Sequence, residues 1–168
     1  MQQEVEGNLF VIIKKTLTGE EGFILCYPQD LKEEFLQKFL GTNKKVSPVK
    51  IGKQAQEILR IEAGIPVFGK DMDSKNILPE TGLEHSCVSY NKGCYIGQEV
   101  IARIKTYGAP NLALMGLAFD GPISPPMNGT VFLKDKKIGV VKSSIRSTFL
   151  GKVIAMAYIH KDYRSPDV

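Results

Sequence analysis

The sequence has no long apolar segment and few residues of the types that build covalent or metal scaffolds. Its longest strongly apolar stretch, residues 9–13, has the length of a strand, whereas a membrane-spanning helix needs about 18 apolar residues. The chain has 3 cysteines and 2 histidines among 168 residues, which argues for reduced thiols and against a disulfide scaffold. Cys87 and Cys94 are separated by six residues, a spacing that matches no common zinc site, so we expect no metal centre.

Charge of one sign is not concentrated anywhere in the chain. The 22 basic and 18 acidic residues give a net charge of +4, and no run of five like charges occurs. This balance permits an acidic ligand but argues against a nucleic-acid-binding arm. The first eight residues carry acids where a signal or transit peptide would carry positive charge. We therefore expect a cytoplasmic protein (mitochondrial matrix if eukaryotic) without a membrane partner.

The composition is that of a folded globular protein. Hydrophobic residues make up 43% of the chain and charged residues 24%, both near the globular average. A chain of this length buries about 70% of its unfolded surface, so a hydrophobic core needs no covalent support.

The first 110 residues are expected to form a hairpin followed by helices. Two short apolar strands flank a glycine-containing turn, and Asp30 is placed to cap the helix that follows. Residues 64–91 hold many glycines and prolines and are expected to be irregular, as segments around a functional site often are. The strands are expected over residues 8–15 and 22–27, and the helices over residues 31–40, 50–63 and 97–105.

The composition changes after Pro110, where short apolar segments alternate with turn residues. This pattern predicts a small all-β unit, a barrel or a sandwich, and hence an α+β fold overall. We place the boundary near residue 110, which gives domains over residues 1–110 and 111–168. The strands are expected over residues 112–119, 130–133, 138–142 and 152–158.

Cys94 lies between Gly93 and Gly97, just before an expected helix. Backbone N–H groups at a helix start, together with Lys92, would favour a reactive thiolate. The alternative is a small buried cysteine in a tight turn, which the chemistry alone favours because free cysteines are commonly buried.

Glu20 and Arg60 are candidate ligand-binding residues. A carboxylate in the 18–22 turn could accept two parallel hydrogen bonds from a guanine-like or pterin-like edge, although acids in turns are usually only solvated. Arg60 could bind a carboxylate or phosphate in bidentate fashion. Its local alternative is a structural pair with Glu57, three residues earlier on the same helix face, which is favoured on that evidence alone.

Four segments together resemble one known family. Residues 92–99, KGCYIGQE, resemble the K-G-C-Y-x-G-Q-E signature of the YgfZ family of folate-binding proteins, within the superfamily of the glycine-cleavage T-protein, an aminomethyltransferase. Residues 59–66 resemble the R-x-E-A-G-x-P segment of that superfamily, and residues 79–83 resemble its P-x-E-x-G-L segment. Residues 18–23 resemble its T-G-E-D/E-G-F hairpin.

The resemblance implies the second half of a GcvT-like folate-binding domain, followed by a small antiparallel β-barrel domain. It further implies a protein that binds tetrahydrofolate or a derivative and supports the assembly or repair of iron–sulfur proteins, its client enzymes. By position, Glu20 would hold the pterin edge, Arg60 would meet the benzoyl-glutamate end, and Cys94 would be the catalytic thiol. Cys94 and Gln98 favour the YgfZ branch over the T-protein branch.

Two other functions are compatible with the same resemblance. One is an aminomethyltransferase of the glycine-cleavage T-protein type, and the other is a folate-binding tRNA-modification module. Relatives carry a further stretch of chain before the hairpin, which in T-proteins supplies the catalytic aspartate, so enzyme activity is left open. We expect a chain without that stretch to self-associate as a homo-oligomer through its incomplete domain.

Overall fold

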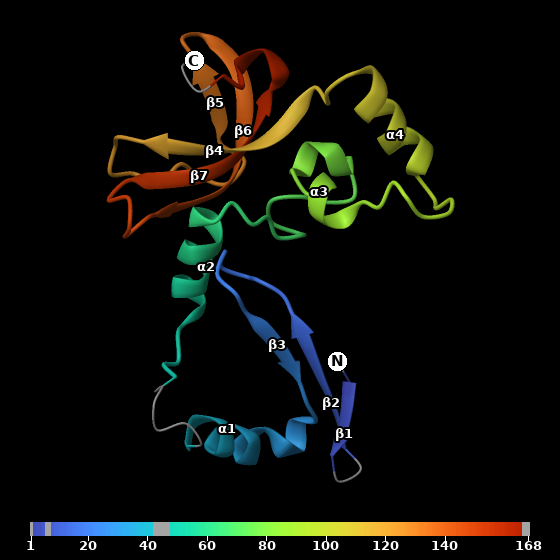
Figure 1. Ribbon diagram of the computed structural model, residues 1–168. Helices are drawn as coiled ribbons and strands as arrows, with labels where there is room; N and C mark the ends of the chain where they lie inside the picture. The colour runs from blue at the N-terminus through green and yellow to red at the C-terminus, as the bar shows by residue number, and fades with distance from the viewer. Residues whose placement is uncertain (1, 6–7, 42–47, 166–168) are drawn as a thin grey trace.

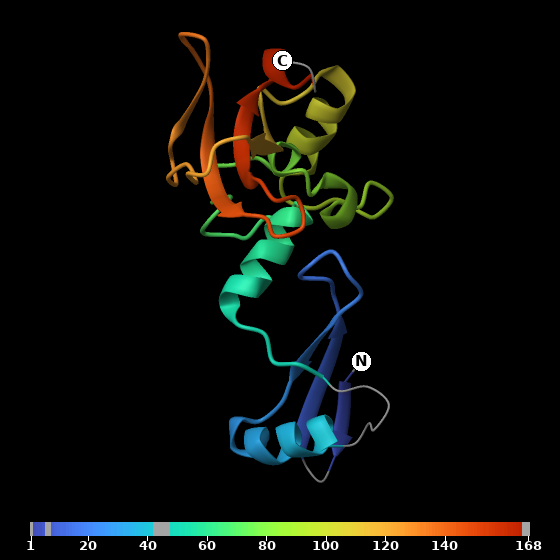
Figure 2. The same ribbon diagram turned by 90° about the vertical axis from the view of Figure 1, so that its left-hand side faces the viewer.

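The computed structural model describes residues 2–5, 8–41 and 48–165. Figure 1 shows two ends of different character: a small N-terminal sheet with one helix, and a C-terminal sheet with several short helices beside it. Helix α2 (Lys53–Glu62) lies between these two ends, and the rotated view keeps the same arrangement (Figure 2).

The N-terminal end is a three-stranded antiparallel sheet in the order β1-β2-β3. Its strands are β1 (Gln2–Val5), β2 (Asn8–Lys14) and β3 (Phe23–Cys26). Strands β2 and β3 form the predicted hairpin, with Ile13 opposite Ile24, whereas β1 lies outside the predicted elements.

Helix α1 (Lys32–Gly41) packs on one face of this sheet through the side chain of Phe35. The ring of Phe35 stacks on Tyr27, with centroids 4.6 Å apart, and lies 6.2 Å from the ring of Phe10. A 3₁₀ turn, η1 (Gln29–Leu31), precedes α1. The predicted capping role of Asp30 is wrong, because Asp30 lies within this turn, whose N-cap residue is Pro28 and which has no side-chain cap.

The middle of the chain is helical in short pieces. Helix α2 begins three residues later than predicted. Residues 64–91, expected to be irregular, contain the turn η2 (Leu78–Thr81) and the one-turn helix α3 (Glu84–Cys87). Helix α4 (Gln98–Tyr107) follows, close to its predicted range.

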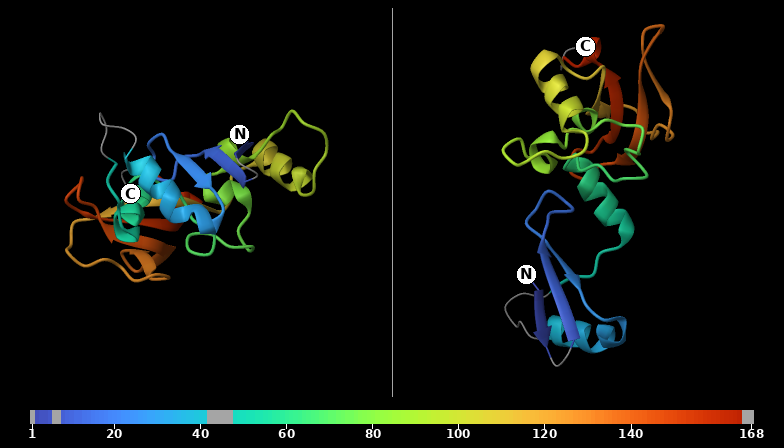
Figure 3. Two further views of the ribbon diagram at one scale, coloured as in Figure 1. Left: turned by 90° about the horizontal axis from the view of Figure 1, so that it is seen from below. Right: turned by 90° about the vertical axis from the view of Figure 1, so that its right-hand side faces the viewer.

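The C-terminal end is a four-stranded antiparallel sheet in the order β4-β7-β6-β5. Strand β4 spans Leu112–Phe119 as predicted, and β7 spans Val153–His160. Strands β5 (Thr130–Leu133) and β6 (Lys136–Arg146) form a hairpin, and β6 is much longer than predicted. The turn η3 (Lys161–Tyr163) follows β7 and is the last element in the described part of the chain (Figure 3).

The core of the molecule lies on both faces of β7, where residues 153–159 are all buried. On one face, Ala155, Ala157 and Ile159 pack with Val141 of β6. On the other face, Ile154 and Met156 pack against Ile61 of α2. Strand β7 therefore reads as a continuous apolar run rather than as an alternating strand, which is typical of a strand covered on both sides.

No helix in the described parts of the chain is both long enough and apolar enough to span a membrane.

Candidate functional site

The hairpin turn that carries Glu20 rests on the end of helix α2. Gly19 has φ +90°, and a Cβ atom added there would lie 2.8 Å from the Cβ of Ala63. Glycine is therefore required at this position both by its backbone conformation and by the close contact. The hydroxyl of Thr16 accepts a hydrogen bond from the Gly19 N–H at 2.8 Å, which fixes the turn.

The two neighbouring acids of this turn have different surroundings. Glu21 forms an ion pair with Lys14, with an Nζ–Oε1 distance of 2.7 Å. Glu20 is exposed and makes no hydrogen bond to any described residue. The carboxylate of Glu20 is thus free to accept hydrogen bonds from a ligand.

Arg60 is 3% exposed, and all its hydrogen-bond donors are used within the chain. Its Nε and Nη2 groups donate to the two carboxylate oxygens of Glu57, and Nη2 also donates to the Ser143 hydroxyl at 3.0 Å. Its Nη1 group donates to Asp71 Oδ2 at 2.8 Å and to the Ile65 carbonyl at 3.1 Å. A guanidinium has five N–H donors, so this network satisfies the whole group.

The carboxylate of Glu57 is held in its charged form by the neighbouring guanidinium. The hydrogen bonds from Arg60 lower the pKa of Glu57 to about 2, against the opposing effect of burial. Burial by itself would lower the pKa of Arg60, but the bonds and charges of Glu57 and Asp71 outweigh it and raise that pKa. Asp71 is fully buried, and its Oδ2 also accepts the Val67 N–H at 2.9 Å.

Three consecutive residues of α2 attach this helix to the C-terminal sheet. Arg60 reaches Ser143 of β6, Ile61 packs in the core, and Glu62 accepts a hydrogen bond from the Ser147 hydroxyl at 2.5 Å. The structural alternative for Arg60, its pair with Glu57, is confirmed. A direct contact between Arg60 and folate stays a prediction, and this network leaves no guanidinium donor free for it.

Cys94 is exposed, so the expectation of a small buried cysteine is wrong. Helix α4 starts after Gly97, which places Cys94 before the first turn of the helix rather than within it. The ammonium of Lys92 lies 5.0 Å from the centre of the Tyr95 ring. Cys94 is therefore accessible to a reagent or a partner.

The structure brings together only part of the predicted site. The Glu20 turn and the Arg60 helix touch through Gly19 and Ala63. The segment between α3 and α4, which carries Cys94, extends away from α2 in Figure 1. Within the described residues, no group of three His, Cys, Asp or Glu side chains is arranged to hold a metal ion.

The sequence analysis missed Asp71 and Ser143 as partners of Arg60. Asp71 lies within residues 64–91, which the sequence predicts to be irregular, and Ser143 lies 83 positions from Arg60 along the chain. A single buried aspartate in a glycine-rich stretch has no spacing signature. Only the fold reveals this pairing.

Two protein-family models match the chain, one over its N-terminal part and the other over its C-terminal sheet. Residues 1–92 match the family model of the GCVT N-terminal domain, and residues 113–167 match that of the glycine cleavage T-protein C-terminal barrel domain. The chain belongs to the glycine cleavage T-protein family. The superfamily resemblance and the predicted α+β fold are thereby confirmed.

Relatives of the chain are named aminomethyltransferase. The protein of Bacillus cytotoxicus is 31% identical over 165 residues, covering 97% of this chain and 44% of the relative. The protein of Staphylococcus carnosus is 32% identical over 158 residues, covering 93% of this chain and 42% of the relative. The chain thus spans less than half the length of these relatives.

A solved structure supports the same fold. The crystal structure of glycine cleavage system aminomethyltransferase T from Bartonella henselae superposes with a TM-score of 0.80 at 23% identity. The match covers 96% of this chain and 44% of the other.

The family implies folate as a cofactor, and the side chains of Glu20 and Arg60 differ in how well they fit its functional groups. A free carboxylate at Glu20 fits a pterin edge, because adjacent N–H groups need an acceptor with two oxygens. The satisfied guanidinium of Arg60 does not fit a folate carboxylate in the same way. The fit therefore rests on Glu20.

Proposed function

We propose that this chain binds a tetrahydrofolate derivative, as part of an aminomethyltransferase of the glycine-cleavage T-protein type. The bound folate would supply the acceptor for a one-carbon unit. The names of the relatives support this activity more than an accessory role in iron–sulfur assembly. The observation that carries the proposal is the free carboxylate of Glu20 on a turn fixed against α2.

In this proposal, different side chains would bind the ligand and position the binding residue. Glu20 would accept the N–H groups of the pterin edge. Arg60 and Asp71 would act as positioning residues, because their buried pair fixes the end of α2 on which the Glu20 turn rests. The proposal keeps the division of the chain near residue 110, with Glu20 and Arg60 in the first part.

The test compares two neighbouring acids of the same turn. Calorimetric titration of the full chain with 5-formyltetrahydrofolate should give saturable binding, and Glu20→Gln should weaken it at least about tenfold, since a charge-assisted hydrogen bond contributes about 1.5–3 kcal/mol. The control, Glu21→Gln, removes a carboxylate that faces Lys14 and should leave binding unchanged. Equal affinity of Glu20→Gln and the unmodified chain would contradict the proposal, as would the absence of any binding by the unmodified chain.

A second candidate function is favoured by one segment. Residues 92–99 carry a cysteine where we expect T-proteins to have none, and the structure exposes its thiol. We infer from this that the chain could serve instead in the YgfZ branch, as a folate-binding factor that supports iron–sulfur proteins as clients. In this role Cys94 would be the functional thiol.

A complementation experiment distinguishes the two functions. In a strain lacking the chromosomal copy, Cys94→Ser should fail to restore the activity of an iron–sulfur enzyme, whereas Cys87→Ser should restore it. Both cysteines are exposed, so the pair controls for general thiol loss. Full restoration by Cys94→Ser would contradict the accessory role.

A further inference from the structure

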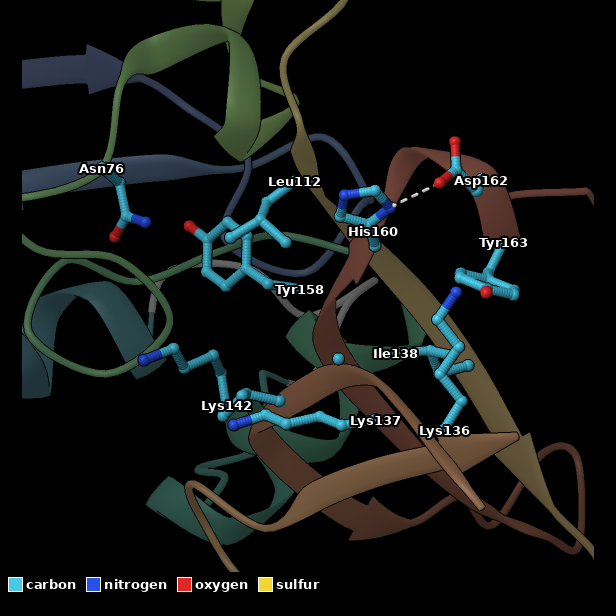
Figure 4. Close-up of a pocket in the computed structure, with 12 residues that line it drawn as sticks. Asn76, Leu112, Lys136, Lys137, Ile138, Lys142, Tyr158, His160, Asp162 and Tyr163 are labelled. Carbon is cyan, nitrogen blue, oxygen red and sulfur yellow. Dashed lines mark ion pairs between the residues drawn. The ribbon is translucent and has the colours of Figure 1, made fainter. Parts of the chain in front are cut away.

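A pocket of about 670 Å³ lies on the C-terminal sheet, away from the residues discussed above. It is formed mainly by β6, the end of β7 and the turn η3, with Leu112 of β4 and Asn76 at its rim (Figure 4). We refer to it as the β6–β7 pocket. None of Glu20, Arg60 and Cys94 lines it, so the proposed folate site does not account for it.

The β6–β7 pocket has an excess of positive charge. Three lysines, Lys136, Lys137 and Lys142, line it, against one carboxylate, that of Asp162. That carboxylate faces the Nδ1 atom of His160 at 3.2 Å and is therefore directed at another lining residue.

Two of these lysines are available to a ligand. Lys137 is exposed, and its ammonium group has no partner among the described residues. The ammonium of Lys142 has only a long contact, 3.5 Å, to the Asn128 side-chain oxygen and lies 5.9 Å from the centre of the Tyr158 ring. Figure 4 shows both ammonium groups on the same side of the pocket, below the Tyr158 ring.

A buried hydroxyl in the pocket lacks a partner. Tyr158 is 3% exposed, and its hydroxyl forms no hydrogen bond to any described residue. Figure 4 shows this hydroxyl directed toward Asn76. The side-chain oxygen of Asn76 already accepts the Asp73 N–H at 3.0 Å. Leaving a buried hydroxyl without a hydrogen-bond partner is unfavourable, so an acceptor atom of a ligand at this position would be stabilising.

The hydroxyl of Tyr158 remains a donor at neutral pH. Burial, with smaller contributions from the charges of Glu80, Asp71 and Asp73, raises the pKa of Tyr158 to about 12. These acids do not cancel the charge of the lysines at the other side of the pocket. Asp71 is paired with Arg60, Glu80 faces the amide of Asn76, and Asp73 is exposed to solvent.

The walls between these polar groups are largely apolar. Leu112, Ile138, Val140 and the ring of Tyr158 contribute to them. A cavity of this size, with apolar walls and a few convergent polar groups, has the general form of a small-molecule site.

We propose that the β6–β7 pocket binds a small organic anion, with its carboxylate or phosphate group between Lys137 and Lys142 and an acceptor atom at the Tyr158 hydroxyl. The body of the ligand is flat and apolar and lies against the apolar wall at Leu112, Ile138 and Val140. Carboxylate and phosphate share the chemistry that the two ammonium groups recognise, and the test below distinguishes them.

The test uses three probes that share one flat body: 2-naphthoate, 2-naphthyl phosphate and the neutral 2-naphthylmethanol. Each is titrated into the isotope-labelled full chain, and chemical-shift changes give both the dissociation constant and the place of binding. At least one anionic probe should saturate and shift the amides of β6 and β7. The neutral probe should bind at least about tenfold more weakly. The tighter of the two anions identifies the natural class of head group.

Variants of the chain then test the named groups. Lys137→Met combined with Lys142→Met should weaken the anionic probe at least about tenfold, and Tyr158→Phe should weaken it several-fold while leaving the ring in place. The control is Lys14→Met combined with Lys105→Met. These two lysines lie outside the pocket, so this variant should bind the anionic probe with unchanged affinity. Equal binding of all three probes, shifts confined to residues outside β6 and β7, or unchanged affinity in the Lys137/Lys142 variant would each overturn the proposal.

Discussion

At the scale of single residues, Arg60 illustrates how burial constrains the role of a charged group. Its five donors are satisfied by two carboxylates, a carbonyl and a hydroxyl, so the charge is compensated where it lies. Removing one partner of such a pair leaves an uncompensated buried charge, which is strongly destabilising. Arg60 is therefore tied to the fold itself, and any effect of its substitution on ligand binding must be separated from an effect on stability.

Glu57 makes the stability of the chain depend on pH in the acid range. Its pKa in the folded chain is about 2, below the ordinary value of 4.5. A lowered pKa means that Glu57 stabilises the folded state above pH 4.5 and that this contribution is lost as the pH falls from about 4.5 to 2. Because Glu57 is partly exposed, we expect its charged form to contribute about 1–2 kcal/mol to the free energy of unfolding at neutral pH.

The measurement is the free energy of unfolding of the unmodified chain and of Glu57→Gln between pH 7 and pH 2. The difference between the two should be largest at neutral pH and should shrink toward pH 2. Glu99→Gln is the control, since Glu99 pairs with Arg103 on an exposed helix face at 3.0 Å and should show little difference at any pH. A pH-independent difference for Glu57→Gln would refute the assigned pKa.

At the scale of elements, local sequence patterns predicted those elements whose own residues determine them. The range of β4 was predicted to the residue, and the hairpin was predicted because a glycine turn separates two apolar segments. The short helices within residues 64–91 were missed because turn residues dominate that segment. The length of β6 was underestimated because Ser143 and Ser144 look like loop residues, although Ser143 is buried against Arg60.

The candidate site was less predictable than the fold. The free carboxylate of Glu20 and the paired one of Glu21 are adjacent in sequence, and only the course of the hairpin distinguishes them. The pairing of Arg60 with Asp71 and Ser143 depends on contacts between segments distant in sequence, which periodicity does not encode.

The pairing of β6 with β7 should tolerate no side chain at Gly139. A Cβ atom there would lie 2.4 Å from the Tyr158 carbonyl oxygen and 2.6 Å from Ile159 Cδ1, so the backbone must shift. We expect Gly139→Ala to lower the free energy of unfolding by about 1–3 kcal/mol, the range for overpacking a core. Chemical denaturation measures this effect.

Gly116 provides the matched control, because it lies in β4 of the same sheet and a Cβ atom there meets nothing within 4 Å. Gly116→Ala should be neutral or slightly stabilising, since alanine loses less conformational entropy on folding than glycine. Similar losses of stability in both variants would show that the close contact at Gly139 is not the cause.

At the scale of the whole molecule, α2 joins the two ends. Its last residues are fixed to the C-terminal sheet through Arg60, Ile61 and Glu62, and Ala63 supports the hairpin turn. The position of the Glu20 turn thus depends on the contact between α2 and the C-terminal sheet.

The N-terminal sheet, by contrast, has an uncovered apolar face. Helix α1 packs on the face that carries Phe10 and Tyr27. On the opposite face, Leu9 is 55% exposed and Ile13 is 44% exposed. Within the described residues, β3 pairs with β2 alone, so its other edge is also open. An open strand edge beside an apolar face is a ready surface for a second copy of the same chain.

We expect the chain to self-associate through this face, with a sedimentation-average mass that rises above 18.6 kDa as its concentration increases. Leu9→Lys combined with Ile13→Lys should return it to a monomer, because two charges on each copy oppose burial of the face. Ile96→Lys is the control, since Ile96 is fully exposed on the segment between α3 and α4. A monomer at every concentration before any substitution, or an equal effect of Ile96→Lys, would rule out this face as the contact between copies.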